Sequence, residues 1–262
     1  AISPIVSIPL GDIARRSVTD EASLYKLFGV NAELLIDHAW GWEPCTIAEI
    51  KSYKPSTNSV SSGQVLHSPH PFEKAKLIAR EMSDMLALDL VDKGLMTDQI
   101  VLTIGFDTEN LKDPTIRKLY HGAVTTDFYG REVPKHAHGT VNLKRHTSST
   151  RRIIEATTEL FDSIVDRNLL IRRINVTANH VIDETTVAKE PEVEQLNLFM
   201  DYAAEEAKRK AEAAEHERER KMQKTMLTIK KRYGKNAILK GMNFEEGATA
   251  KDRNAQIGGH KA

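Results

Sequence analysis

Ten histidines and one cysteine are the side chains of this sequence best suited to bind a metal or to act as a nucleophile. His136 and His138 alternate along one predicted strand, and His67 and His70 lie close together in the sequence. Neither pair is followed by a third ligand at a convincing spacing, and a zinc site needs at least three protein ligands. Cys45 stands among Trp and Pro residues with no recognisable base beside it, and a thiol nucleophile needs one. The sequence therefore predicts no metal site, no self-contained catalytic site and no cofactor in this chain.

Positive charge is concentrated in one stretch of a chain whose formal net charge is zero. Residues 133–154 include no Asp or Glu, but they include three histidines and five cations: Lys135, Lys144, Arg145, Arg151 and Arg152. The total charge does not indicate a nucleic-acid partner, although a local run of cations permits a positively charged face. The phosphate-binding glycine motifs G-x-x-x-x-G-K-[ST] and G-x-G-x-x-G do not occur.

The single cysteine and the hydropathy pattern bear on the cellular compartment. One cysteine among 262 residues excludes a disulfide within the chain, which fits a reducing compartment. No apolar run reaches membrane-spanning length, and the first residues lack the pattern of a signal peptide. We therefore expect a cytoplasmic protein without a membrane partner. Because the first residue is Ala and not Met, we also expect a processed chain or a piece of a longer one.

The middle of the chain, residues 58–184, has the periodicity of an α+β unit. Its predicted strands and helices follow each other as strand 58–66, helix 72–94, strand 99–107, strand 135–147, helix 147–166 and strand 169–179. This order predicts a four-stranded antiparallel or mixed sheet with both helices on one face.

The other face of this sheet would be open to solvent, and the period of two along each strand predicts its side chains. They are amides, hydroxyls and bases without a carboxylate: Gln99, Thr103, His138, Thr140, Asn142, Lys144, Arg173, Asn175, Thr177 and Asn179. Such groups suit a phosphate backbone. The alternative is an ordinary solvated face, since antiparallel sheets commonly expose one side.

The regions on either side of the α+β unit are predicted to be smaller than that unit. Residues 1–45 contain short capped helices with an inward apolar face, and residues 46–57 form a polar linker. After the sheet, residues 185–200 form a second linker. Residues 201–262 form a charged tail that is expected to be helical or disordered and mobile toward its end. Residues 108–134 are predicted to be an extended hairpin or loop, and the sequence indicates no role for them.

Several segments resemble Y-family translesion DNA polymerases of the DinB/UmuC type. NSVSSGQVL, QIVLTIGFD, VNLKRHTSST and LLIRRINVTANHV are similar, in this order, to four strands of the family's little-finger domain, including its S-R-x-R-T and I-R-R-hydrophobic-G-V patterns. PLGDIARRS and LYKLFGVNAELLIDHAWG resemble the later part of the thumb domain. The closing residues resemble the tail of UmuC-like repair proteins of Gram-positive bacteria. Together these segments cover nearly the whole chain.

The resemblance implies a DNA-binding region without the polymerase active site. The palm of the family, whose carboxylates bind two Mg²⁺ ions, precedes the thumb and has no counterpart in this sequence. The helix-hairpin-helix that opens the thumb is also missing, so the family's catalytic residues are carried over to no position. Combined with the alternation, the resemblance implies DNA contacts from Ser59, Ser61, Ser62, Gln64, His138, Thr140, Asn142, Lys144, Arg145, Thr147, Arg173, Asn175 and Thr177.

The segment EQLNLFMD, residues 194–201, places three large apolar residues just before the charged tail. QLNLF matches the pattern Q-L-x-L-F with which bacterial polymerases of this family bind the sliding clamp. The resemblance implies clamp binding through Gln195, Leu196, Leu198 and Phe199, with the last two side chains in an apolar pocket. The alternative is that these residues pack on their own domain.

These observations predict the DNA-binding and clamp-docking C-terminal region of an error-prone translesion polymerase. Its partners would be primer–template DNA, bound through the backbone without sequence specificity, and the bacterial sliding clamp. The Mg²⁺ ions of the reaction would belong to the palm of the parent protein. A non-catalytic protein-interaction adaptor in a DNA repair complex is the alternative, and salt-dependent DNA binding would distinguish the two.

Overall fold

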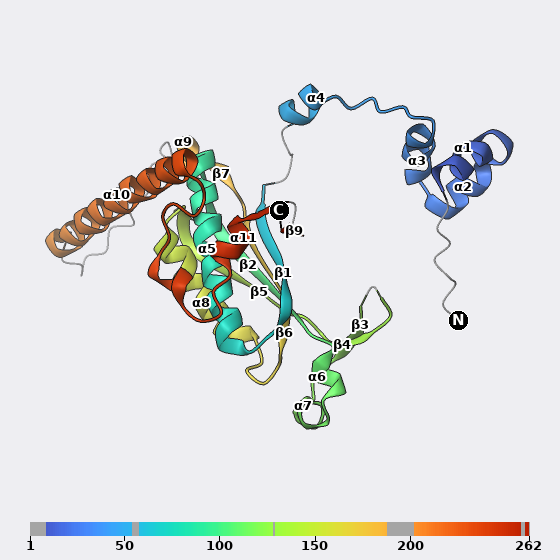
Figure 1. The fold of residues 1–262 in the computed structure, drawn as a ribbon. Helices are drawn as coiled ribbons and strands as arrows, with labels where there is room; N and C mark the ends of the chain where they lie inside the picture. Colours follow the sequence, from blue (N-terminus) through green and yellow to red (C-terminus); the bar gives the residue numbers. More distant parts are fainter. Residues whose placement is uncertain (1–8, 54–57, 128, 188–201, 258–259, 262) are drawn as a thin grey trace. The chain divides into compact units, whose positions relative to one another are not determined.

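The computed structural model describes residues 9–53, 58–127, 129–187, 202–257 and 260–261. They belong to two compact units, residues 1–57 and residues 58–262, which we call the N-terminal and C-terminal units (Figure 1). Among the residues that the structure describes, none of the helices has both the length and the apolarity needed to cross a bilayer.

The N-terminal unit consists of short helices: α1 (Leu10–Thr19), α2 (Glu21–Phe28), α3 (Asn31–Ala39) and α4 (Ile47–Ser52). Ile13, Leu24 and Ala32 form its small core. The fourth helix lies within the stretch predicted as a linker. It begins at a capping box, in which Thr46 Oγ1 accepts the Glu49 N–H at 3.2 Å and Glu49 Oε2 accepts the Thr46 N–H at 2.7 Å.

The C-terminal unit is built on an antiparallel sheet with the strand order β1-β6-β2-β5 (Figure 1). These strands are β1 (Val60–His70), β2 (Leu95–Phe106), β5 (Ala137–Thr147) and β6 (Ile171–Asn179). A short further strand, β7 (Ile182–Asp183), pairs with the start of β2. The predicted α+β class and four-stranded sheet are confirmed, with β7 as an addition.

Two helices, α5 (Phe72–Lys93) and α8 (Thr150–Ile164), cover one face of this sheet. The strand residues that alternate toward them are buried: Ile100, Leu102, Ile104, Ile174, Val176 and Ala178. Between the helices, the rings of Phe72 and Phe161 meet edge to face, with centroids 5.0 Å apart. The prediction that both helices lie on one face is therefore confirmed, and the opposite face carries partly or fully exposed side chains.

An insertion separates β2 from β5, in the region predicted to be a hairpin or loop. It contains α6 (Glu109–Lys112), α7 (Pro114–Leu119) and a hairpin of β3 (Val124–Thr126) and β4 (Glu132–Pro134). Figure 1 shows these elements beyond the ends of the sheet strands, away from α5 and α8.

The C-terminal residues form a further layer over α5 and the start of α8. The elements after β7 are α9 (Glu184–Val187), α10 (Tyr202–Tyr233), the 3-10 helix η1 (Gly241–Phe244), α11 (Ala250–Asn254), β8 (Gln256–Ile257) and β9 (His260–Lys261). In α10, Gln223 and Met226 are buried. This helix is therefore not solvated along its whole length, as a polar single helix would be.

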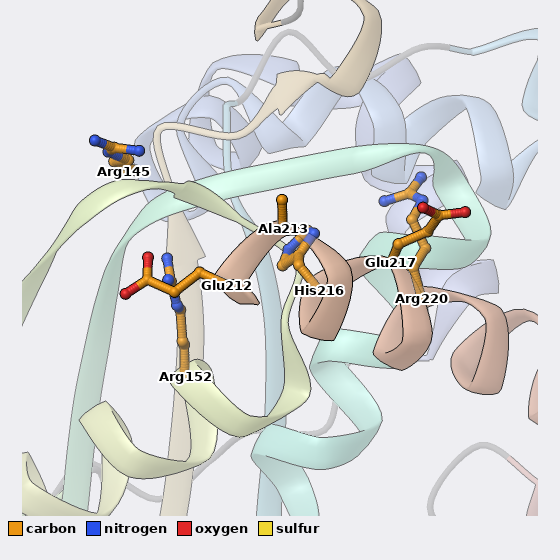
Figure 2. A pocket seen from close by; sticks show the side chains of 7 residues that line it. All are labelled: Arg145, Arg152, Glu212, Ala213, His216, Glu217 and Arg220. Atoms are coloured by element: carbon orange, nitrogen blue, oxygen red, sulfur yellow. The ribbon is translucent and has the colours of Figure 1, made fainter. Parts of the chain in front are cut away.

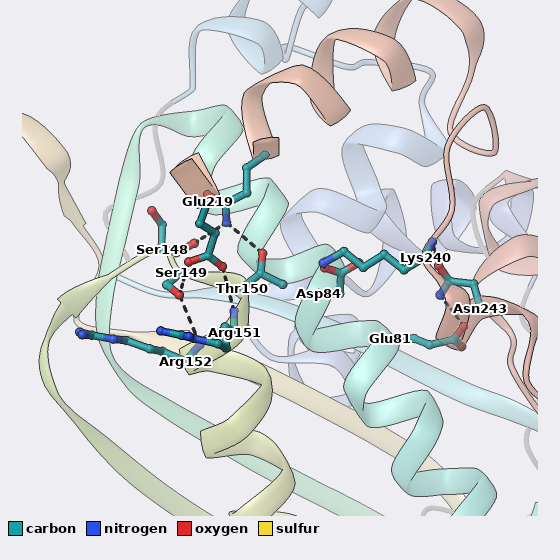
Figure 3. A network of polar contacts seen from close by, with 11 residues as sticks. Glu81, Asp84, Ser148, Ser149, Thr150, Arg151, Arg152, Glu219, Lys240 and Asn243 are labelled. Carbon is teal, nitrogen blue, oxygen red and sulfur yellow. Dashed lines mark hydrogen bonds and ion pairs between the residues drawn. The ribbon is translucent and has the colours of Figure 1, made fainter. Parts of the chain in front are cut away.

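Two buried carboxylates of α5 hold the residues after α10 (Figure 3). Glu81 is only 1% exposed and accepts hydrogen bonds from Asn243 Nδ2 at 2.7 Å, the Thr249 N–H at 2.8 Å and the Ala250 N–H at 3.1 Å. Asp84 is paired with Lys240 Nζ at 2.6 Å. The sequence predicts a tail that is mobile toward its end, but residues 240–250 are docked on α5, where Lys240, Asn243, Thr249 and Ala250 satisfy these carboxylates.

Candidate nucleic-acid interface

The face of the sheet opposite α5 and α8 presents polar side chains in rows that cross the strands. The register places Ser61, Thr177, Val101 and Thr140 opposite one another in one row. The neighbouring rows are Gly63–Asn175–Thr103–His138, Asn179–Gln99–Asn142 and Val65–Arg173–Gly105. We call these residues, together with Lys144, the open face. It brings together eight predicted DNA-binding residues: Ser61, His138, Thr140, Asn142, Lys144, Arg173, Asn175 and Thr177.

Cross-strand hydrogen bonds orient several of these side chains. Asn179 Nδ2 donates to Gln99 Oε1 at 3.0 Å, and Gln99 Nε2 donates to Asn142 Oδ1 at 2.8 Å. Thr103 Oγ1 and His138 Nδ1 lie 2.9 Å apart. The Asn142 amide thus uses its acceptor within this chain of amides, and its Nδ2 has no hydrogen-bond partner among the described residues. An oriented amide donor of this kind can bind a phosphate oxygen.

Lys144 and Arg173 are exposed cations on this face, and neither forms an ion pair within the described part of the chain. Arg173 lies over Gly105 of the adjacent strand, because a Cβ at Gly105 would come within 3.1 Å of the Arg173 Cβ. Asp98, at a bulge at one end of the face, has its carboxylate 2.9 Å from His180 Nδ1 and 3.7 Å from His146 Nε2. The open face therefore offers cations and donors, and its nearby carboxylate is engaged by histidines.

The structure places the other predicted residues elsewhere. Ser62 and Gln64 alternate to the opposite side of β1, where Gln64 Oε1 accepts from Arg253 Nη1 at 3.1 Å, under the docked tail. Thr147 is buried, and its Oγ1 accepts the Ser149 N–H at 3.0 Å. Ser59 is exposed and precedes β1. The sequence motifs assign these residues to the DNA contacts, but a motif does not reveal which face of the sheet each residue occupies.

Arg145 lines a pocket between the end of β5, the start of α8 and α10 (Figure 2). The lining has mixed charge: Arg145, Arg152, Glu212, Ala213, His216, Glu217 and Arg220. Arg220 is already paired with Glu184. A pocket with this many charges of both signs lacks the apolar lining typical of small-molecule sites.

Arg151, at the start of α8, contacts the carboxylates of α10 (Figure 3). Glu219 accepts hydrogen bonds from Ser149 Oγ at 2.6 Å and from the Arg151 N–H at 3.0 Å. Arg151 Nη2 donates to Glu215 Oε2 at 3.2 Å, and this hydrogen bond raises the pKa of Arg151. The basic stretch predicted from the sequence is therefore divided, since Lys144 belongs to the open face and Arg151 to a contact with α10.

Chemistry of other kinds has little support in the described residues. No cluster of three or more His, Cys, Asp or Glu side chains there could hold a metal ion. Cys45 is exposed in the N-terminal unit. The predicted clamp-binding residues Gln195, Leu196, Leu198 and Phe199 lie outside the described residues.

Comparison with known proteins gives one match to a family model and several to solved structures. Residues 57–198 match the model of the impB/mucB/samB family C-terminal domain. No curated protein matches the chain. A complex of the beta-clamp processivity factor and the little finger domain of PolIV matches with 12% identity and a TM-score of 0.31, over 54% of this chain and 99% of that one. A Y-family DNA polymerase chimera matches with 13% identity and a TM-score of 0.31, over 66% of this chain and 41% of that one.

Proposed function

Because the chain belongs to the impB/mucB/samB family and contains its C-terminal domain, we propose that its C-terminal unit binds the backbone of primer–template DNA through the open face. The observation that carries this proposal is the composition of that face. Lys144 and Arg173 are exposed and unpaired within the described residues, and they stand among hydroxyl and amide groups. Phosphate oxygens are bound by these groups in proteins that hold DNA without reading its sequence.

The wider role we propose is that of a C-terminal region of a translesion DNA polymerase. Binding through phosphates tolerates a damaged base, because the contacts do not depend on base identity. Nucleotidyl transfer and its Mg²⁺ ions would belong to a palm domain of the parent protein, and the residues of this chain would hold the DNA. A relation to the UmuC-like repair proteins of Gram-positive bacteria is part of the same proposal.

We also propose that residues 194–201 bind the bacterial sliding clamp. The support is the Q-L-x-L-F pattern together with the elements on either side of the segment. α9 precedes it, and the pairing of Glu184 in α9 with Arg220 in α10 ties the two flanking helices together. The segment is therefore connected to the DNA-binding unit at both of its ends. A clamp that binds the segment would be held close to this unit, which raises the effective concentration of the clamp near the DNA.

DNA binding by the full chain tests the main proposal. Fluorescence anisotropy with a labelled primer–template and with duplexes of unrelated sequence should give similar affinities. The logarithm of the association constant should fall linearly with the logarithm of salt concentration, with a slope of about −0.9 for each phosphate contact. A slope near zero would favour the protein-interaction adaptor, because an adaptor's partners need not be polyanions.

A further inference from the structure

The insertion, residues 107–136, is anchored to the sheet by one buried amide. Asn110 is completely buried, and its Nδ2 donates to Asp107 O at 2.9 Å and to Leu170 O at 2.8 Å. Its Oδ1 accepts the Leu170 N–H at 2.7 Å. Leu170 directly precedes β6, the strand that carries Arg173. The base of the insertion is therefore held at the end of the sheet where Arg173 lies.

The helix α7 has an inner and an outer side. Ile116 and Tyr120, one turn apart, pack against the main core, and Tyr120 Oη donates to Ala123 O at 2.6 Å. Gly122 leaves the space for this ring, because a Cβ there would lie 2.5 Å from Tyr120 Oη. Arg117 and Lys118 occupy the positions that follow Ile116, and both are exposed. The inner contacts thus direct these two cations away from the core.

Several acidic side chains of the insertion are engaged within the fold. Asp113 caps α7 by accepting the Thr115 N–H at 2.7 Å, and this hydrogen bond to the backbone lowers the pKa of Asp113. Asp127 accepts from Arg131 Nε at 2.8 Å, and this contact lowers the pKa of Asp127. Asp107 Oδ2 lies 3.7 Å from Arg172 Nε. Of the acids described in the insertion, Glu109, Asp113 and Glu132 are exposed and form no ion pair within the described residues.

Apart from Arg131, the cations of the insertion are not engaged in this way. The remaining exposed cations form no ion pair within the described residues. They are Lys112, Arg117, Lys118 and Lys135. The four outward cations exceed the three outward carboxylates of Glu109, Asp113 and Glu132, so this surface has a small net positive charge, although the formal charges of residues 107–136 cancel.

This positive surface is continuous with the open face. Lys135 immediately precedes His136 and β5, and the next outward residue of that strand is His138. At the same end of the sheet, Arg173 is paired with Gly105, near the end of β2. A DNA backbone bound across the open face would therefore meet further cations where β2 and β5 lead into the insertion.

We propose that the insertion is a second DNA-binding surface of this chain, which contacts the phosphate backbone of the duplex beyond the end of the sheet. This inference rests on the proposed function of the open face and extends it. The partner is nucleic acid because the outward groups are cations that can each neutralise a phosphate. The insertion makes these contacts through Arg117 and Lys118, and Lys112 and Lys135 are its further exposed cations.

The test compares two double variants of the full chain. Arg117→Ala/Lys118→Ala removes the outward cations of α7. Lys224→Ala/Lys235→Ala removes two exposed cations, in α10 and just after it, that form no ion pair with any described residue. DNA affinity is measured by anisotropy on a duplex of about 20 base pairs, roughly two helical turns. Loss of two phosphate contacts flattens the salt slope by about 1.8, so the ratio of wild-type to variant affinity falls about tenfold between roughly 50 and 200 mM salt.

The control variant should bind within about twofold of the wild type at every salt concentration. If the insertion variant also does so, the inference is wrong and the insertion serves another partner, such as an acidic protein surface. Arg117→Gln/Lys118→Gln provides a second neutral variant should the alanines disturb α7. A wild-type chain without salt-dependent binding would refute the proposed function itself. If the wild-type chain binds DNA with the expected salt dependence and the insertion variant binds with the same affinity and slope, only this inference is refuted.

Discussion

Removal of the Glu81 side chain tests whether the C-terminal tail is part of the folded unit. Glu81→Ala deletes the acceptor of three hydrogen bonds that come from Asn243, Thr249 and Ala250, more than 160 residues along the chain. A hydrogen bond to a charged group contributes about 1.5 to 3 kcal/mol. The two backbone donors can regain water once the tail lifts away, so the three contributions do not add in full.

We therefore expect Glu81→Ala to lower the free energy of unfolding of the C-terminal unit by about 3 kcal/mol, within the range for breaking a buried charged contact. For a unit of this size the melting temperature falls about 2 to 4 °C per kcal/mol, which gives a decrease of about 6 to 12 °C. Differential scanning calorimetry measures this directly. Glu159→Ala is the matched control, since Glu159 is exposed on α8 and should change stability by less than about 0.5 kcal/mol.

Truncation before residue 234 completes a double-mutant cycle. Without the tail, Glu81 has lost its three donors, and Glu81→Ala should then change stability by less than about 0.5 kcal/mol. If Glu81→Ala destabilises the truncated and the full chain equally, its effect comes from α5 alone. That result, or an unchanged melting temperature in the full chain, would refute the docking of the tail.

Two further predictions concern the clamp segment and the anchor of the insertion. Leu198→Ala and Phe199→Ala should each weaken binding of the segment to the sliding clamp by about 1 to 3 kcal/mol in calorimetric titrations, while Gln195→Ala should cost less and Asn197→Ala almost nothing. Their melting temperatures should stay close to that of the wild type, and a decrease of several degrees with intact clamp binding would mean that the residues pack on their own domain. Asn110→Ala should destabilise the C-terminal unit by about 2 to 3 kcal/mol, because it leaves the Leu170 N–H without its partner and removes one of the two donors to the Leu170 C=O, the other being the Asp107 N–H. Chemical denaturation measures this loss, and an unchanged midpoint would show that Asn110 is not the anchor.

Local periodicity was sufficient to predict the sheet and its two faces. Ile100, Leu102 and Ile104 alternate with polar residues in the sequence, and the structure buries all three against the helices. The side chain opposite each strand residue could not be predicted in this way. The row that joins Asn179, Gln99 and Asn142 depends on the register of three strands and on a bulge after Thr97, and a single strand carries no information on its partner's register.

The docked tail could not be predicted, because its contacts are between residues far apart in the sequence. Glu81 and Asp84 belong to an amphipathic helix, where a carboxylate is expected to face water, and the tail that covers them has no hydrophobic period. The same holds for Gln64, which a motif placed among DNA contacts and which the structure places beside Arg253. Buried polar contacts of this kind depend on the whole fold, and composition alone does not indicate them.

The central claim is that the open face holds DNA through its phosphates, and the salt dependence of two variants of the full chain tests it most directly. Lys144→Ala/Arg173→Ala should bind primer–template DNA more weakly than the wild type, with a salt slope flatter by about 1.8, because two phosphate contacts are lost. Lys224→Ala/Lys235→Ala should keep the wild-type slope. An unchanged slope in the first variant, together with a flatter slope in the second, would place the DNA on the helical side and contradict the account.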